Sequence, residues 1–375
     1  MSSIRLAMVG VGNCASSLVQ GIHYCREYGE DAVGVLHPLL GGYRPEDIEV
    51  VAAFDIDRRK VGRDVGDAIW QAPNCTTAFH RRVPETGVAV RMGALLDGVA
   101  AHMGQAPDGT RFLPSDAAQP SADEVTALLR ETRTEVVINF LPVGSEQATR
   151  FYAGCALEAG AALVNAMPVF IASDPEWAGR FAARGLPIVG DDFKAQIGAT
   201  ITHRALANLF KLRGVPIRHT YQLNIGGNTD FYNMLDHERL GTKRRSKTEA
   251  VQSSSERRLS EQDIRIGPSD YVPWLKDNKV AFVRMEGALF GGVPMNLELR
   301  LSVEDSPNAA GVAVDAIRCA RIGLDRGIGG VLEGPSAFLC KHPPQQHPDE
   351  QALALLEEFA SGPVAAPAVL RKTGA

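Results

Sequence analysis

The chain has 375 residues, of which 45% are hydrophobic and 22% charged, and its formal net charge is -5 at pH 7. This length allows two domains with a large core, and the composition is typical of a globular protein rather than a disordered or fibrous one. The negative charge argues against a nucleic-acid binder, and the sequence has no apolar run of about 18 residues that would predict a membrane span.

The six cysteines are scattered along the chain, and none forms a C-x-x-C pair. This distribution predicts reduced thiols in the cytoplasm rather than disulfides or a structural zinc site. The first strand pattern begins within a few residues of Met1, so we also expect no signal peptide.

The first predicted element is a buried parallel strand over residues 4–9, and the sequence GVGNCASS follows it directly, before a helical pattern. A strand, a glycine-rich turn and a helix form the context of a dinucleotide-binding fingerprint. Gly10 permits the tight turn, Gly12 lets a pyrophosphate approach the helix N-terminus, and Ala15 takes the third motif position.

An acid at the end of the second strand is expected to hold the adenosine ribose, and EVVAAFDID offers Asp55 or Asp57. The usual spacing from the glycines is about twenty residues, so we interpret residues 27–46 as an insertion. We choose Asp55, with a carboxylate that caps the next helix as the alternative. Residues 57–70 then predict a helix, and residues 73–120 an irregular excursion.

From Ser121 onward, helix and strand patterns alternate, and the strands end near Asn139, Asn165 and the pair Asp191 and Asp192. The carboxyl ends of parallel strands form the ligand-binding edge of such a sheet. The alternation over residues 4–205 predicts the α/β class, with a Rossmann-type doubly wound parallel sheet.

After residue 206, strand patterns follow one another without long helices, which predicts an inserted α+β domain over residues 206–305. The edges of its sheet need covering, and pairing with another subunit is one solution. Residues 306–375 return to a helical pattern and are expected to pack on the first domain, residues 1–205.

The stretch Tyr221–Lys247 carries amides, a carboxylate and two lysines that can bind a phosphorylated polyol: Asn228, Asp230, Asn233, Lys243 and Lys247. A solvated basic run is the alternative interpretation of KRRSK. Three further candidates stand at element junctions, each with the alternative of a solvated lysine or a helix cap: Lys279, Asp305 and Lys341.

Together, these blocks resemble the myo-inositol-1-phosphate synthase family, in its shorter bacterial and archaeal branch: GVGNCASS, LPVGSE, VNAMPVFIAS, VGDDFKAQIGATITHR, NIGGNTDFYNM, SKT, GPSDYVPWL and EDSPNAAGVAVDA. The ordered set covers nearly the whole chain and is more specific than any single block. The resemblance implies a Rossmann domain that the C-terminal segment completes. It also implies a middle domain that supplies catalytic residues and a tetramer interface.

The resemblance further implies tightly held NAD, recycled in each turnover, and conversion of D-glucose 6-phosphate to 1D-myo-inositol 3-phosphate. The steps are oxidation at C5, enolisation, aldol closure and reduction, and fixed ammoniums would stabilise the developing charges. By resemblance, Lys243 transfers the proton at C5, Lys279 and Lys341 stabilise oxyanions at C5 and C1, and Lys247 binds the phosphate or a hydroxyl.

The matching acids would orient lysines, the nicotinamide ribose or the substrate: Asp192, Asp230 and Asp305. The residues expected to bind the cofactor are Gly10, Gly12, Asn13, Cys14, Ala15, Asp55, Asn139, Asp191, Asp192 and Asn228.

Three residues depart from the family pattern: Asn139, where a serine is common, and Thr229 and Tyr232 beside Asp230. They leave the identity of the sugar-phosphate substrate undecided, because a cyclase that turns fructose 6-phosphate into a five-membered carbocycle would keep the same catalytic residues. An NAD(P)-dependent sugar-phosphate or polyol dehydrogenase and a non-catalytic dinucleotide sensor are further alternatives. We expect no protein-caged zinc, whereas the resemblance allows a cation bridging the pyrophosphate or the substrate.

Overall fold

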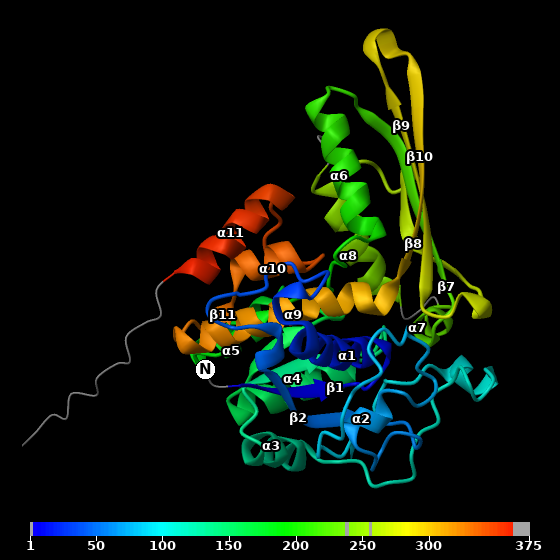
Figure 1. The fold of residues 1–375 in the computed structure, drawn as a ribbon. Helices are drawn as coiled ribbons and strands as arrows, with labels where there is room; N and C mark the ends of the chain where they lie inside the picture. Colours follow the sequence, from blue (N-terminus) through cyan, green and yellow to red (C-terminus); the bar gives the residue numbers. More distant parts are fainter. Residues whose placement is uncertain (1–2, 237–239, 255–256, 363–375) are drawn as a thin grey trace, which may run out of the picture.

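The computed structural model describes residues 3–236, 240–254 and 257–362 (Figure 1). Residues 237–239, inside the predicted polyol-binding stretch, lie outside the described residues, and so do residues 363–375 at the end of the C-terminal segment. In the described part, no helix is long and apolar enough to cross a membrane.

The first sheet has seven strands in the order β11-β6-β5-β4-β1-β2-β3, and all its neighbouring pairs are parallel. The strands are β1 (Ile4–Val9), β2 (Ile48–Asp55), β3 (Arg91–Met92), β4 (Val136–Asn139), β5 (Ala162–Asn165), β6 (Pro187–Val189) and β11 (Gly330–Val331). Because β1 lies between β2 and β4, the strand order reverses there, and this is where Rossmann folds bind ligands. The predicted α/β class is confirmed.

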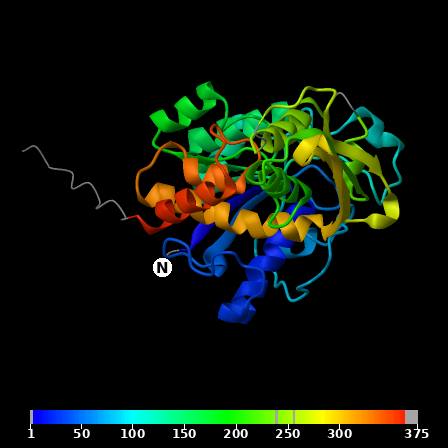
Figure 2. The same ribbon diagram turned by 90° about the horizontal axis from the view of Figure 1, so that it is seen from above.

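Helices cover both faces of this sheet (Figures 1 and 2). One face packs against α1 (Asn13–Tyr28) and α9 (Asp305–Asp325), and the other against α3 (Ala122–Glu131), α4 (Glu146–Ala159) and α5 (Pro175–Ala183). Along β1, Leu6 and Met8 belong to the hydrophobic core on the side of α1 and α9, whereas Ala7 and Val9 belong to the core on the side of α3, α4 and α5. This period of two is that of a strand buried on both faces.

The helix predicted over residues 57–70 is wrong, since only α2 (Val65–Ala68) forms there. The Asp57 carboxylate accepts from its neighbour Arg59 and from Leu113 N, which ties this segment to the excursion instead. Residues 73–120 are irregular as predicted, apart from β3 and a short 3-10 turn.

The second sheet has the order β10-β9-β7-β8, and only β7 and β8 are parallel. The strands are β7 (Ile217–Gly226), β8 (Ile264–Tyr271), β9 (Asn278–Ala288) and β10 (Pro294–Glu304). Three helices accompany the sheet: α6 (Ala199–Leu212), α7 (Thr229–Asn233) and α8 (Gly241–Gln252). The hairpin of β9 and β10 projects away from the rest of the molecule beside α6 (Figure 1).

All four strands of the second sheet lie in sequence between β6 and β11 of the first, so this region is an insertion. The chain returns through α9, which crosses from the second sheet toward α10 (Glu333–Leu339) and α11 (Asp349–Ser361) (Figure 2). The predicted domain boundaries, after residues 205 and 305, fall within α6 and at the first residue of α9.

Candidate active site

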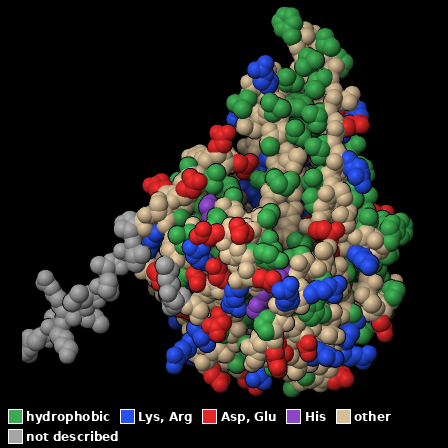
Figure 3. All heavy atoms as spheres, viewed as in Figure 1, with side chains coloured by type: hydrophobic (Ala, Val, Ile, Leu, Met, Phe, Trp, Pro, Cys, Tyr) green, Lys and Arg blue, Asp and Glu red, His purple; other side chains and the backbone are tan. Residues whose placement is uncertain are grey.

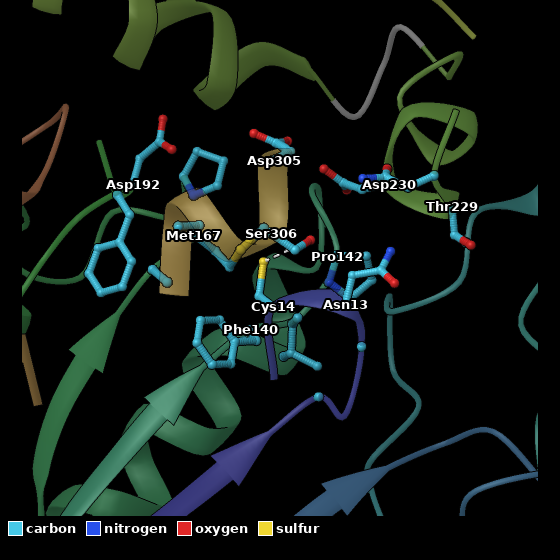
Figure 4. Close-up of a pocket in the computed structure, with 18 of the residues that line it drawn as sticks. Asn13, Cys14, Phe140, Pro142, Met167, Asp192, Thr229, Asp230, Asp305 and Ser306 are labelled. Atoms are coloured by element: carbon cyan, nitrogen blue, oxygen red, sulfur yellow. Dashed lines mark hydrogen bonds between the residues drawn. The ribbon is translucent and has the colours of Figure 1, made fainter. Parts of the chain in front are cut away.

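A cavity lies at the carboxyl ends of the parallel strands and is closed by α7, α8 and the first turn of α9. Figure 4 shows Asp192, Asp305 and Asp230 along one side of it, above Asn13 and Cys14, the first two residues of α1. The cavity therefore joins the strand ends of the first sheet to residues of the inserted region.

The glycine loop forms the end of the cavity next to β1. Gly10 has a φ of +92°, and a Cβ there would lie 2.9 Å from Phe140 O, so only glycine fits. Gly12 precedes the first turn of α1, and no side chain caps this helix end. The free backbone N–H groups at this end of α1, together with Asn13 and Cys14 in the cavity wall, form a site suited to an anionic pyrophosphate.

Ala15, which the sequence analysis expected to contact the cofactor, lies away from the cavity. It is fully buried in the core beneath α1. Its place as a cofactor contact is therefore corrected, because the third motif position serves close packing of helix and strand.

Asp55 lines the cavity at the end of β2, as chosen from the sequence. Its carboxylate accepts from Val11 N and Asp57 N, both at 2.8 Å. Sequence reasoning missed Lys60, whose buried Nζ lies 3.9 Å from Asp55 Oδ2 and donates to Val11 O and Asn74 Oδ1 at 2.8 Å. Lys60 fixes the glycine loop to the segment that follows β2.

Two predicted cofactor residues, Asn139 and Asp191, do not line the cavity. The Asn139 amide donates to Asn165 Oδ1 at 2.9 Å, and Asn165 donates in turn to Asp191 Oδ1 at 2.6 Å. The Asp191 carboxylate also accepts from the backbone N–H groups of residues 171–173. Both predictions are corrected: these buried side chains link the ends of β4, β5 and β6 behind the cavity wall.

Four lysines, Lys243, Lys247, Lys279 and Lys341, meet in the cavity with the acids Asp192, Asp230 and Asp305. Three of the lysines have a carboxylate partner. Lys243 Nζ lies 3.3 Å from Asp230 Oδ2, Lys279 Nζ 2.8 Å from Asp305 Oδ1, and Lys341 Nζ 2.7 Å from Asp192 Oδ1. The structure thus brings together every residue that the sequence analysis gave a catalytic role.

Lys247 differs from the other three lysines. It is 4% exposed, and within the described ranges its ammonium makes no hydrogen bond or ion pair. Burial and the neighbouring Lys243, Lys279 and Lys341 hold the pKa of Lys247 well below its usual value. Burial opposes the charge of Lys279 too, but Asp305 outweighs it and raises the pKa of Lys279.

Asp277, which the sequence analysis missed, lies behind this cluster. Its carboxylate accepts from Asn228 Nδ2 at 3.0 Å and from Ser306 Oγ at 2.9 Å. It thereby ties the first turns of α7 and α9, which carry Asp230 and Asp305. Burial and the charge of Asp305 raise the pKa of Asp277 to about 6. The sequence feature that could have identified Asp277 as a site residue is its position two residues before Lys279.

The residues that depart from the family pattern near Asp230 dock the excursion onto α7. Thr229 Oγ1 donates to Thr110 O at 2.8 Å. The Tyr232 ring packs against His102 and Tyr271, with centroids 5.1 and 5.2 Å apart. Tyr232 is not part of the cavity wall, whereas Thr229 lines the cavity but has its hydroxyl engaged by the excursion.

Polar side chains of β7 complete the cavity wall. Gln222 Nε2 donates to Asn224 Oδ1 at 3.2 Å, and both residues line the cavity. Asn233, in contrast, turns its amide away to Val143 O, at 2.8 Å. The wall thus presents amides, carboxylates and ammoniums, which suits a ligand with several hydroxyls and an anionic group.

A family model described as myo-inositol-1-phosphate synthase matches residues 198–306. The inositol-3-phosphate synthase of Mycobacterium tuberculosis (strain CDC 1551 / Oshkosh) is 51% identical over 363 residues, 96% of each chain. That of Corynebacterium glutamicum is 51% identical over 365 residues, 96% of this chain and 98% of its own. The crystal structure of Ari2 matches with a TM-score of 0.77 and 33% identity, over 96% of this chain and 100% of its own.

Proposed function

Because the chain belongs to the myo-inositol-1-phosphate synthase family, we propose that it converts D-glucose 6-phosphate to 1D-myo-inositol 3-phosphate. It is an enzyme of the isomerase type. The observation that carries the proposal is the group of four lysines and three acids at the end of a dinucleotide fold. Several fixed ammoniums suit a reaction that creates oxyanions at more than one carbon, whereas a dehydrogenase can use a single proton-transfer group.

The cofactor end of the cavity fits NAD. The glycine-only turn at Gly10, the uncapped end of α1 and the acid Asp55 stand in the order that a dinucleotide requires. When bound, NAD would accept a hydride from C5 of the substrate and return it after ring closure, so that the reaction has no net oxidation.

One of the lysines transfers protons, and two others stabilise the negative charges that form on the substrate oxygens. Lys243, oriented by Asp230, takes the proton of the C5 hydroxyl and returns it when that hydroxyl forms again. Lys279, held as an ammonium by Asp305, stabilises negative charge on the C5 oxygen. Lys341 does the same for the C1 oxygen as the aldehyde is attacked.

Lys247 is assigned to the phosphate. Three carboxylates pair with three of the four lysines in the cluster, so Lys247 is left without an acidic partner. A phosphate group of the substrate supplies the missing negative charge and favours protonation of Lys247.

The test is an incubation with glucose 6-phosphate and a small amount of NAD⁺. We expect an inositol phosphate, identified by NMR, and no accumulation of NADH. Stoichiometric release of NADH would instead identify a dehydrogenase. A parallel incubation tests fructose 6-phosphate: a carbocycle from this ketose, with no product from glucose 6-phosphate, would overturn the proposal.

A dinucleotide sensor is distinguished by one substitution. Lys243→Met should abolish turnover while the Kd for NAD stays within about threefold, because Lys243 lies on α8 and not on the glycine loop. Unchanged turnover would remove the assignment of Lys243.

We also propose that the chain forms a homotetramer through the β9–β10 hairpin. Phe290 at its tip is fully exposed, and Val293 is 55% exposed. On the neighbouring α6, Leu212 is 72% exposed. Figure 3 shows hydrophobic side chains gathered along this projection. Exposed apolar groups concentrated on one element are typical of a subunit interface.

A sugar-phosphate substrate and six free cysteines support a cytoplasmic location.

A requirement for a cation is a separate proposal. Within the described ranges, no three His, Cys, Asp or Glu side chains are grouped so that they could hold a metal ion. A required cation would therefore take part of its ligands from the bound dinucleotide or substrate. Loss of activity on chelation, restored by one particular cation, would support this proposal, and unchanged activity would refute it.

A further inference from the structure

Arg204, on α6, lies outside the cavity wall and joins three elements of the fold. It is 1% exposed. Its Nε donates to both oxygens of Asp349 at 3.2 Å, at the start of α11. Its Nη1 donates to Ala250 O, near the end of α8, to Ser253 Oγ at 2.8 Å and to Gln346 Oε1 at 3.2 Å.

One branch of these contacts leads to Lys341. Gln346 accepts from Arg204 and donates through Nε2 to Lys341 O at 2.7 Å. The side chain of Lys341 reaches Asp192 in the cavity. Arg204 is thus connected to the backbone of a candidate catalytic lysine through one intervening side chain.

A second branch leads to α8, which carries Lys243 and Lys247. Arg204 donates to a carbonyl near the C-terminal end of this helix, where a cation is favoured by the helix dipole. The same helix contacts Asp192 through Ser246 Oγ, at 2.6 Å. The two branches therefore converge on the lysine cluster from segments that lie far apart in the sequence.

The start of α11 is held from the other side by Lys194. Its Nζ lies 3.3 Å from Asp349 Oδ1 and donates to Ala337 O, in α10, at 2.7 Å. Asp349 thus receives two buried cations, and the C-terminal segment is fixed to the end of β6 and to α6 at once.

We propose that Arg204, with Gln346 and Asp349, is a positioning group that sets the placement of Lys341 relative to the lysines of α8. The planar guanidinium donates in several directions from one rigid frame, which a flexible ammonium cannot do. A shift of about 1 Å in a catalytic group can cost roughly 100-fold in rate, so a frame that fixes two lysine-bearing segments controls turnover without touching the substrate. The inference rests on the proposed function for its rate readout.

The test uses the full-length enzyme loaded with NAD. Gln346→Leu removes the link to Lys341 O and leaves the pair of Arg204 and Asp349 in place. We expect kcat to fall about tenfold, while the KM for glucose 6-phosphate and the Kd for NAD stay within about twofold. The matched control is Gln345→Leu, because this neighbouring glutamine is exposed and should leave kcat unchanged.

A second readout separates positioning from general damage to the fold. Amide hydrogen exchange in Gln346→Leu should rise in residues 341–349 and stay at the wild-type level in the glycine loop. Arg204→Lys should lower kcat further, because one ammonium cannot replace the fork that reaches α8 and Gln346 together. Wild-type kcat in Gln346→Leu would overturn the inference, and so would a loss spread equally over kcat, KM and melting temperature. If the wild type forms no inositol phosphate, the proposed function fails, and the exchange measurement alone decides the positioning role.

Discussion

Lys341 and Asp192 pair twice, although 149 positions separate them in the sequence. The ammonium of Lys341 lies 2.7 Å from Asp192 Oδ1, and its backbone N–H donates to Asp192 O at 2.6 Å. The pair joins the C-terminal segment to the end of β6 at the cavity. The candidate active site is therefore assembled from three parts of the chain: the strand ends, the inserted region and the returning segment.

Lys341→Met should lower kcat by about 100-fold, since it removes a fixed ammonium from a developing oxyanion. Binding of NAD should change little, because the glycine loop and Asp55 stay intact. The matched control is Lys211→Met, an exposed lysine on α6. Equal activity of the two variants would contradict the assignment.

Affinity for the substrate should fall as pH rises. The pKa of Lys247 is lowered by burial and by three neighbouring cations, so its ammonium group loses a proton at a lower pH than an ordinary lysine does. A phosphate dianion binds the protonated form better, which means that binding takes up a proton and that KM increases with pH. Lys247→Gln should raise KM at low pH and flatten this dependence. A KM in the wild type that does not vary between pH 6 and 9 would refute the proposal.

The free energy of unfolding should depend on pH through the protonation of His203, which is completely buried between Thr220 and Gln222. Burial lowers its pKa from 6.5 to about 4. Between those values the unfolded chain binds the proton more readily, so stability is fully present above pH 6.5 and is lost as pH falls toward 4. The loss amounts to about 3 kcal/mol for this group.

The measurement is the urea midpoint at several pH values from 4.5 to 7.5. His203→Gln should weaken the decline on the acid side, whereas His219→Gln, at an exposed position, should follow the wild type. Parallel curves for wild type and His203→Gln would show that another group causes the decline.

If the proposed homotetramer forms, Phe290→Ser combined with Val293→Ser should shift it toward smaller species in light scattering after gel filtration. Both side chains are exposed at the turn of the β9–β10 hairpin, where an apolar contact with another subunit is expected. Val33→Ser serves as the control, because this residue is 81% exposed on the first domain. An unchanged mass for the double variant would place the interface elsewhere.

The alternation of strands and helices was sufficient to predict the Rossmann-type sheet, because its five longer strands each carry an apolar run. The two-residue strands β3 and β11 carry none and were not predicted. The helix predicted over residues 57–70 failed because Asp57 bonds to Leu113, a contact across 56 positions that no local pattern contains. The inserted sheet was predicted as a class, but neither its strand order nor its hairpin was.

The site was predictable where a motif dictates the geometry, as at Gly10 and Asp55. Asn139 and Asp191 were misplaced, because a position at a strand end does not tell whether a side chain faces the cavity or the neighbouring strand. Lys60 and Asp277 were missed for a related reason: their roles depend on hydrogen bonds formed only after folding.

The late position of β11 in the chain has a consequence for biosynthesis. As the protein leaves the ribosome, β6 is an open edge of the nascent sheet until residues 330–331 emerge. The whole inserted region is translated in the meantime, so the nascent chain presents unpaired backbone groups over a long interval. Closure of this edge and arrival of Lys341 beside Asp192 follow within about ten residues of each other. The segment that closes the sheet at β6 therefore also brings Lys341 to the cavity, so both steps depend on the same returning stretch of chain.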